Sequence, residues 1–404
     1  MTETLSPKTD WKAVWYGVSL GVLASLQQFK LPPAMPLMLS QYGYGKTLAG
    51  SFMSVYAVAG LLVSIPVGKR LAAKGPMGLL SAAFAVFLAG NALALLLPES
   101  GAAMFASRAL EGLGFTILAV TGAVIATLAA TPGDRPVAVA LWASWIPAGQ
   151  IIATLIAIPS VFAGLWRPLW IGSILATVGL WALGYALYKK GSETLRPPRQ
   201  AAPRPKDQAG DEASGKGKGY LLFIASLHFG LWSGQYITFV TWLPQYMVEV
   251  LGIAPSTAAR AYLIPCVMVI PLTLYGARLL RNGASISTLL TLSTAVQAVI
   301  WFLIPVTRSP WAGALSLALY GATSGITATA IFSVPGALMG KEASKAFAAM
   351  MAGRNFGVLV GPVLLAQAVT MAGNWSFVPY IFGSACLVCL AIGLHLCAGM
   401  DKHL

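Results

Sequence analysis

The sequence predicts an all-α integral membrane protein with twelve transmembrane helices in two pseudo-symmetric six-helix halves. Two observations carry this prediction, namely the apolar character of the chain and an internal repeat that divides it in two. Of the 404 residues, 57% are hydrophobic and only 9% are charged. A soluble domain of this length needs far more charge on its surface, so the chain is expected to lie in a membrane.

Apolar stretches of about 20 residues recur along the chain, each long enough to cross roughly 30 Å of hydrocarbon. They lack the short alternating pattern of β-barrel strands, so we expect helices. In the first half, the expected helices span 13–39, 47–67, 76–97, 102–129, 136–162 and 168–188. In the second half, they span 220–248, 257–275, 285–304, 311–334, 346–371 and 377–397.

The repeat becomes visible when the chain is shifted by 208 residues. Residues 68–75 then fall on residues 276–283, and the two segments share the pattern G-x-R-L-x-x-x-G. The same shift pairs three further positions: Gln27 with Gln235, Pro36 with Pro244, and Gly149 with Gly357. A fixed offset of half the chain indicates two copies of one structural unit.

One long polar segment, residues 189–219, separates an N-terminal half at 1–188 from a C-terminal half at 220–404. The segment is rich in Pro, Gly and charge, and Leu195 is its only large apolar residue. Such a composition cannot bury a core, so we expect a cytoplasmic linker between the halves.

The net charge of +14 is explained by membrane topology. If the N-terminus is cytoplasmic, 19 of the 26 Lys and Arg residues lie in cytoplasmic segments. This bias is the positive-inside pattern, which sets orientation and requires no nucleic-acid partner. We therefore expect both termini in the cytoplasm. The remaining Lys and Arg residues fall in outer segments or at the outer end of a helix (Lys46, Arg167, Arg260, Arg308) or deeper within helices (Lys30, Arg108, Arg354).

The sequence offers no support for enzymatic chemistry or for a cofactor. It has no phosphate-binding G-x-x-x-x-G-K-[ST] segment and no His, Cys or carboxylate cluster with metal-ligand spacing. Cys386 and Cys389 form a C-x-x-C pattern inside an apolar helix without a nearby acid or histidine, so we interpret them as packing residues.

Four charged residues within the expected helices are candidate functional groups, because each such charge costs ~2.5–3.5 kcal/mol on insertion scales. Arg108 and Glu111 lie three residues apart on one helix face and form a candidate gating or proton-coupling pair, or a purely structural one. Arg354, followed by Asn355, has no acid in its own helix, and with Lys30 it is a candidate ligand for an anionic solute. The alternatives are snorkelling and contacts with backbone carbonyls.

The seventh expected helix carries a stripe of polar and aromatic residues with helical spacing. It consists of His228, Trp232, Gln235, Phe239 and Trp242, with Tyr236 beside it. Such a stripe is typical of a binding cavity, with Gln27 at the equivalent position of the first helix, or else of interhelical packing. His228 is a further candidate for proton coupling.

The chain resembles the major facilitator superfamily from end to end. Residues 68–75 and 276–283 resemble the family's loop between helices 2 and 3 and its copy in the second half, although the family's Asp is absent. Residues 107–114 match its helix 4 pattern of an Arg followed by Gly. The segments 29–36, 142–149 and 354–357 are similar to the cyanate permease-like bacterial branch.

The resemblance implies a secondary active transporter of the bacterial inner membrane, in which a monomer moves a small solute by alternating access. The excess of helix-buried cations favours an anionic solute. An exporter of amphipathic, drug-like compounds and a non-transporting ligand sensor are the alternatives. The expected substrate-binding residues are Gln27, Lys30, Trp232, Gln235, Tyr236, Arg354 and Asn355, and the expected gating or coupling residues are Arg108, Glu111 and His228.

Overall fold

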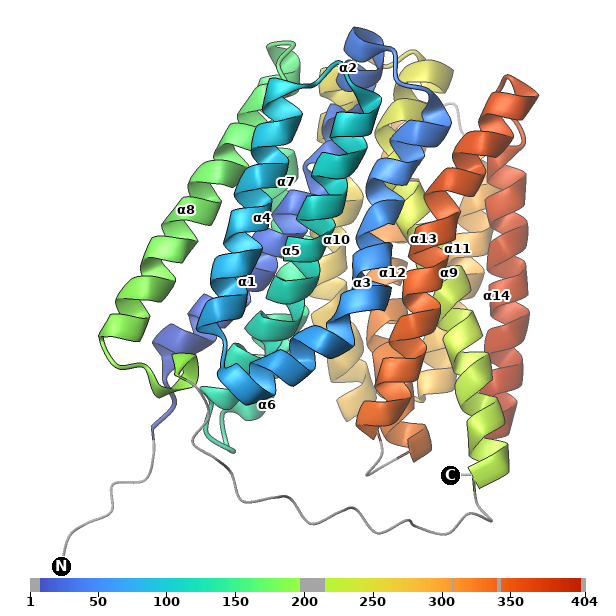
Figure 1. Ribbon diagram of the computed structural model, residues 1–404. Helices are drawn as coiled ribbons and strands as arrows, with labels where there is room; N and C mark the ends of the chain where they lie inside the picture. The colour runs from blue at the N-terminus through green and yellow to red at the C-terminus, as the bar shows by residue number, and fades with distance from the viewer. Residues whose placement is uncertain (1–7, 197–214, 307–308, 340–342, 401–404) are drawn as a thin grey trace, which may run out of the picture. The chain divides into compact units, whose positions relative to one another are not determined.

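The computed structural model describes residues 8–196, 215–306, 309–339 and 343–400, and its regular elements in these ranges are helices (Figure 1). Ten of the helices in the described residues are long and apolar enough to cross a membrane. The chain divides into two compact units, which are described separately.

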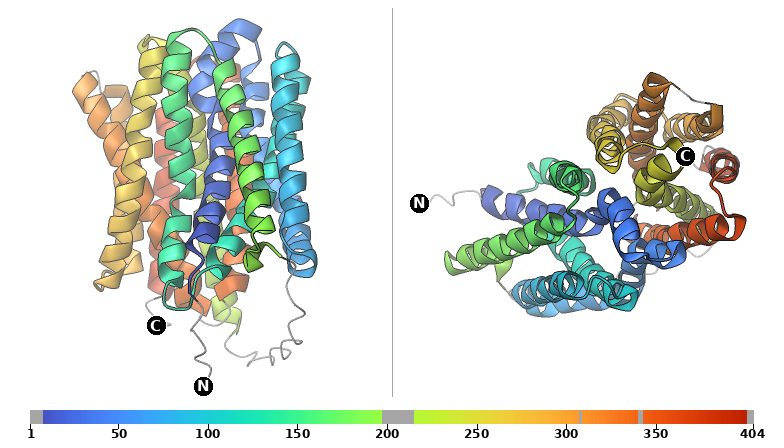
Figure 2. Two further views of the ribbon diagram at one scale, coloured as in Figure 1. Left: turned by 90° about the vertical axis from the view of Figure 1, so that its left-hand side faces the viewer. Right: turned by 90° about the horizontal axis from the view of Figure 1, so that it is seen from above.

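Unit 1 comprises Met1–Leu31 and Val58–Arg204. Its helices are α1 (Trp11–Phe29), the later part of α3 (Lys46–Lys74), α4 (Met77–Leu96), α5 (Gly101–Leu128), α6 (Arg135–Ala143), α7 (Trp145–Phe162) and α8 (Arg167–Lys189). The helix α1 packs against α5, α7 and α8, and both views of Figure 2 show the green α8 beside the dark-blue α1. Buried Leu195, in the short 3-10 turn Glu193–Leu195, fixes the start of the expected linker to α5 and α8. Residues 197–214 of that linker lie outside the described residues.

Unit 2 comprises Pro32–Ala57 and Pro205–Leu404. Its helices are α2 (Leu31–Tyr42), the first part of α3, α9 (Gly215–Leu251), α10 (Pro255–Arg281), α11 (Ile286–Leu303), α12 (Pro310–Met339), α13 (Ala343–Ala372) and α14 (Val378–Met400). The pairs α9–α13 and α10–α12 pack closely along their lengths.

Two of the expected helices are interrupted. The stretch expected at 13–39 is α1 followed by α2, with a break at Lys30, because Pro32 and Pro33 have no N–H to donate to the preceding turn. The stretch expected at 136–162 is α6 followed by α7, with a break at Ser144 three residues before Pro147.

The repeat predicted from sequence recurs as packing within each unit. In unit 1, a Cβ on Gly149 would lie 2.5 Å from the Val22 carbonyl oxygen and 2.7 Å from the Leu26 nitrogen. In unit 2, a Cβ on Gly357 would overlap the carbonyl of Gly230 and lie 3.0 Å from the nitrogen of Gly234. All three positions of the second contact follow those of the first by 208 residues. A glycine therefore allows the close approach of α7 to α1 in unit 1 and of α13 to α9 in unit 2.

The backbone conformation explains why the G-x-R-L-x-x-x-G segment ends in glycine in both copies. Gly75 and Gly283 have φ angles of 75° and 92°, the left-handed region that terminates a helix. Each follows the end of its helix, α3 or α10. The shared segment is thus a helix end that occurs once in each unit.

A charged cluster in unit 2 ties the start of α3 to the end of α9. The Glu249 carboxylate accepts hydrogen bonds from Trp375 Nε1 (2.6 Å) and Gln245 Nε2 (2.6 Å), and Lys46 Nζ lies 3.1 Å from it. Partial burial alone would raise the pKa of the Glu249 carboxyl, but the hydrogen bonds from Trp375, Gln245 and Lys46 hold it below its ordinary value. Together with the hydrogen bond from Ser54 Oγ to the Val358 carbonyl (3.4 Å), this cluster ties residues 32–57 to the second half of the chain.

Changing Gly357 to Ala is expected to destabilise the protein, because the new methyl group overlaps the carbonyl of Gly230. Overpacking of this kind costs about 1–3 kcal/mol, which thermal unfolding of the purified protein can measure. The control is Gly336→Ala in α12, where a Cβ meets no atom within 4 Å. Equal melting temperatures for the two variants would contradict the close α9–α13 crossing.

Changing Glu249 to Gln is expected to increase hydrogen exchange in residues 46–57, because Lys46 loses its carboxylate partner. The folded pKa of Glu249 is lowered, so its contribution to stability is present above the ordinary carboxyl pKa and is lost as the pH falls through the folded value. The difference between variant and wild type should therefore shrink from about pH 7 to about pH 3. Exposed Glu99→Gln is the control, and an equal effect of that change would contradict the role of Glu249.

Candidate functional site

A buried charge cluster lies in unit 1 where α1 ends. Lys30 is 1% exposed, and its ammonium donates to Gln27 Oε1 (2.6 Å), Asn91 Oδ1 (2.6 Å) and Glu111 Oε1 (2.8 Å). An ammonium has three N–H donors, so these three bonds use its full capacity. In this structure, Lys30 would have to release one of these partners before it could bind a solute.

Arg108 completes the cluster from α5. Its guanidinium donates to the Glu111 carboxylate, to the Gln27 carbonyl at 2.9 Å and to the Gln28 carbonyl at 2.8 Å. Pro32 has no N–H with which to satisfy the Gln28 carbonyl, so the break in α1 leaves this acceptor for Arg108. The negative end of the α1 dipole favours both cations of the cluster. The expected contact between Arg108 and Glu111 is therefore present, together with a contact to the first helix.

Two side chains from α8 close the cluster. Gln27 Nε2 donates to Thr177 Oγ1 at 3.2 Å, and Lys30 Nζ lies 4.7 Å from the centre of the Trp170 ring. Neither residue was among the candidates from sequence, and neither was Asn91. The signal for Asn91 was its polar side chain within an otherwise apolar helix, whereas Trp170 and Thr177 carry no such signal.

In unit 2, Gln235 occupies the centre of a neutral hydrogen-bond network. Its Oε1 accepts from Tyr320 Oη at 2.7 Å and from Trp301 Nε1 at 3.2 Å. Its Nε2 donates to Gln297 Oε1 at 3.2 Å, and Gln297 in turn donates to Ser324 Oγ. The repeat-related residues Gln27 and Gln235 are thus both network centres, one among charges and one among aromatic and neutral polar groups.

The stripe on α9 faces the interior of the protein. Its five residues are at most 7% exposed, which excludes a lipid-facing anchor. Beside the stripe, Tyr236 is half-buried and stacks on Trp232 with ring centroids 5.5 Å apart, and on Tyr320 at 6.5 Å. The three parallel rings form an aromatic stack within unit 2.

Buried polar atoms of α9 lack hydrogen-bond partners in the part of the chain that the structure describes. They are both ring nitrogens of His228, Nε1 of Trp232, Oγ of Ser233 and Oε1 of Gln245, and His228 and Trp232 lie one helical turn apart. The thiol of Cys389 contacts the backbone carbonyl of His228 and leaves its ring free. Buried polar groups are normally paired, so these atoms are candidates to bind a solute or a water molecule.

Arg354 lies on α13, next to the crossing with α9. Its side chain is half-buried and donates to Asn355 Oδ1 at 3.0 Å. Among the described residues, the structure records no ion pair for Arg354. A Cβ on Gly230 would lie 2.8 Å from the Gly353 carbonyl oxygen, so the stretch of α13 that holds Arg354 directly contacts the α9 turn before Trp232.

The structure thus gathers the candidate residues into two groups. Gln27, Lys30, Arg108 and Glu111 form one network in unit 1. In unit 2, Tyr236 stacks on both Trp232 and Tyr320, and Tyr320 also donates a hydrogen bond to Gln235. Arg354 and Asn355 lie on α13, which packs against α9. Among the described residues, no group of His, Cys, Asp and Glu could hold a metal ion.

Comparison with solved structures finds transporters of the same fold. A bacterial homolog to the human lysosomal transporter Spinster, inward-facing and unoccupied, is 13% identical, with a TM-score of 0.74 over 98% of this chain and 96% of that one. The peptide transporter POT in complex with sulfate is 14% identical, with a TM-score of 0.77 over 96% and 94% of the two chains. A D-xylose-proton symporter is 15% identical, with a TM-score of 0.73 over 96% and 97%.

No curated protein matches the sequence. The model of the Major Facilitator Superfamily, however, matches residues 18–344, which is most of the chain. With the apolar helices and the fold of known transporters, this match means that the chain belongs to the Major Facilitator Superfamily and is a multi-pass membrane transporter rather than an enzyme.

Proposed function

We propose that the protein moves a small anionic solute across the bacterial inner membrane by alternating access, as a monomer with both termini in the cytoplasm. The observation that carries the proposal is Arg354, a half-buried cation without a recorded ion pair among the described residues. A buried cation is stable only when an anion or strong dipoles meet it, and a solute anion can supply that partner. The narrower likeness to the cyanate permease-like branch remains part of this proposal.

The proposed architecture is twelve spans in two halves, with α1–α2 and α6–α7 each counted as one span. Neither α1 nor α9 is among the ten helices that are long and apolar enough, and α2, with 12 residues, is too short to be one. These helices carry the polar residues Gln27 and Lys30 in the first half, and His228 and Gln235 in the second. Less apolar, Pro-containing spans at corresponding positions of two repeats are indicators of a transporter's binding site.

We assign solute binding in unit 2 to Arg354 and Asn355, with Trp232, Gln235 and Tyr236 from α9. A guanidinium can bind a carboxylate or similar oxyanion through two parallel hydrogen bonds. The aromatic stack of Trp232 and Tyr236 offers a flat surface to an organic group beside that anion. Lys30 contributes only when it exchanges its bond to Glu111, Asn91 or Gln27 for one to the solute.

We assign coupling to Glu111, with Arg108 and Lys30 as its partners and His228 as a second proton-binding candidate. Glu111 is fully buried and contacts two cations, so the three side chains together carry one positive charge. A proton on Glu111 would raise that charge to two and weaken its hold on Lys30.

An exporter of amphipathic compounds is the second candidate, favoured by the stack of Trp232, Tyr236 and Tyr320. A non-transporting sensor with the same fold is the third. A thermal-shift screen of the purified protein against small carboxylates, inorganic oxyanions and amphipathic cations separates the first two candidates, because a ligand that binds the native state raises its stability. Stabilisation by cations alone would overturn the anion proposal.

The variant Arg354→Ala is expected to lose the stabilisation by the anion that the screen identifies, and Arg354→Lys is expected to weaken it. Loss of a charge partner in a buried site costs about 2–5 kcal/mol, which corresponds to at least about thirty-fold weaker binding. Exposed Arg260→Ala removes the same charge elsewhere and serves as the control. Unchanged anion binding by Arg354→Ala would refute the assignment.

The charge cluster predicts that variants of Glu111 and Lys30 differ in stability according to the charge they leave unbalanced, and not according to the number of hydrogen bonds they lose. Glu111→Gln leaves two buried cations without an acid and is expected to destabilise by about 3–5 kcal/mol. Lys30→Met leaves the Arg108–Glu111 pair neutral, so it should be milder, and adding Lys30→Met to Glu111→Gln should restore part of the loss. Thermal unfolding of the three variants measures this order.

The coupling role is tested on the same variants in proteoliposomes. If Glu111 carries the proton, transport by Glu111→Gln should no longer depend on pH. A variant that folds, transports and keeps the pH dependence of the wild type would leave Glu111 with a structural role only.

A further inference from the structure

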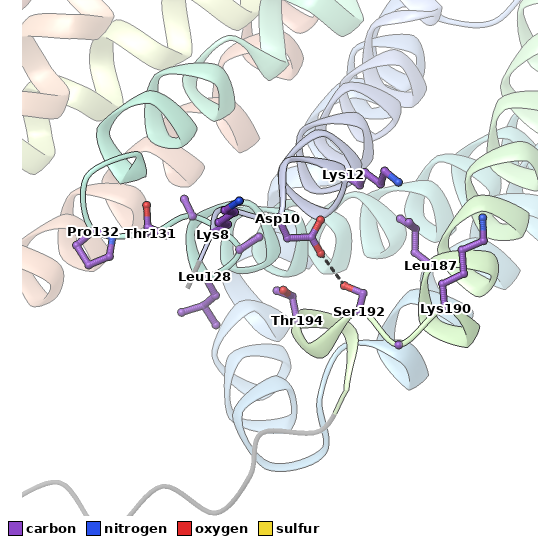
Figure 3. A pocket seen from close by; sticks show the side chains of 13 residues that line it. Lys8, Asp10, Lys12, Leu128, Thr131, Pro132, Leu187, Lys190, Ser192 and Thr194 are labelled. Carbon is purple, nitrogen blue, oxygen red and sulfur yellow. Dashed lines mark hydrogen bonds between the residues drawn. The ribbon is translucent and has the colours of Figure 1, made fainter. Parts of the chain in front are cut away.

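A second polar site lies at the other end of unit 1 from the α4–α5 connection, away from the charge cluster. It is a cavity of about 610 Å³ between the start of α1, the α5–α6 connection and the end of α8 (Figure 3). Its lining combines ammonium groups, hydroxyl groups and apolar side chains. The residues that give it this character are Lys8, Lys12, Lys190, Ser192, Thr194 and Leu128.

The walls of this cavity are held by specific hydrogen bonds. The Asp10 backbone N–H donates to the Ala129 carbonyl at 2.9 Å, and the Thr131 N–H donates to Thr9 Oγ1 at 3.0 Å, which join α1 to the α5–α6 connection. Ser192 Oγ donates to Asp10 Oδ2 at 3.3 Å, which joins the end of α8 to the same place (Figure 3). The cavity is thus a built feature of unit 1.

The charge of the cavity is strongly one-sided. Three lysines line it, and among the described side chains no ion pair is recorded for any of them. Among the described side chains that line it, the one carboxylate is Asp10, which caps α1 by accepting from the Ala13 N–H at 3.1 Å and also accepts from Ser192. Three ammonium groups against one engaged carboxylate suit a ligand with a phosphate-like anionic group.

The surroundings of the cavity indicate where that anion comes from. Trp11 and Trp15 on α1 are 39% and 53% exposed, and Tyr185 and Tyr188 on α8 are 50% and 38% exposed. Exposed Trp and Tyr residues mark the membrane–water interface. Leu128, which lines the cavity, is 66% exposed and offers an apolar surface next to the lysines. A ligand with both an anionic group and a hydrocarbon chain fits this combination better than a free anion does.

We propose that this cavity binds the headgroup of an anionic phospholipid of the cytoplasmic leaflet. Lys8, Lys12 and Lys190 meet the phosphate charge, the Ser192 and Thr194 hydroxyls are additional donors, and Leu128 with the neighbouring aromatic residues contacts the lipid's glycerol and upper acyl chain. The proposal goes beyond solute transport and rests only on the orientation given above, in which this end of unit 1 faces the cytoplasm. Clusters of basic residues at that surface attract anionic lipids.

The test compares two triple variants of the full-length protein that lose the same charge. Lys8→Gln/Lys12→Gln/Lys190→Gln alters the cavity, and Lys69→Gln/Arg70→Gln/Lys74→Gln alters exposed residues at the end of α3. Delipidated protein is titrated with phosphatidylglycerol and with phosphatidylcholine, and bound lipid is counted by native mass spectrometry. We expect wild type and the α3 variant to prefer phosphatidylglycerol, and the cavity variant to bind it roughly tenfold more weakly or worse.

Competition with inorganic phosphate and with glycerol phosphate identifies the source of the anion. Little displacement of phosphatidylglycerol at millimolar concentration supports a lipid site, whereas full displacement would make the cavity a site for a soluble phosphate and would overturn the lipid proposal. Equal losses in the two triple variants would also overturn it, since they would indicate diffuse charge. Anion binding at Arg354 should be unchanged in the cavity variant, so failure of either proposal can be recognised separately.

Discussion

The interruption of α1 at Lys30 is the constraint on which the polar interior of unit 1 depends. A helix that ends inside the protein exposes carbonyl groups that must find donors, and prolines at positions 32 and 33 cannot supply them. Arg108 does so from α5, and its charge requires an acid within reach. Glu111 is that acid, and it also meets Lys30 at the break. The cluster therefore follows from a backbone requirement and remains positively charged by one unit.

In unit 2, the helix is not interrupted at the position that corresponds to Lys30, because α9 continues from Gly215 to Leu251. Thr238 and Val240 stand at the positions that correspond to Lys30 and Pro32, so no carbonyl is released and no cation is needed. Gln235 instead binds neutral partners, Tyr320 and Trp301. The two copies of the repeat thus differ at equivalent positions, with charged side chains in unit 1 and aromatic and neutral polar side chains in unit 2.

The sequence was sufficient for an all-helical membrane protein of the transporter kind, because apolar length and a repeated pattern can be recognised along the chain without knowledge of its contacts. It also placed Arg108 and Glu111 together, since both lie on one helix face. It could not supply the break at Ser144 or the partners Asn91, Trp170 and Tyr320, which reach their network centres from other helices. The three bonds of Lys30 were equally out of reach, since they depend on the approach of α4 and α5 to α1.

The difference between the units bears on how a transporter of this kind can be driven. The interior of unit 1 is built on charge, because Glu111 contacts both Lys30 and Arg108. The interior of unit 2 can change its contacts, because stacked rings and the glycine crossing of α9 and α13 present surfaces without fixed ion pairs. The two copies of the repeat therefore have different interiors, a charged network in unit 1 and a neutral, aromatic network in unit 2.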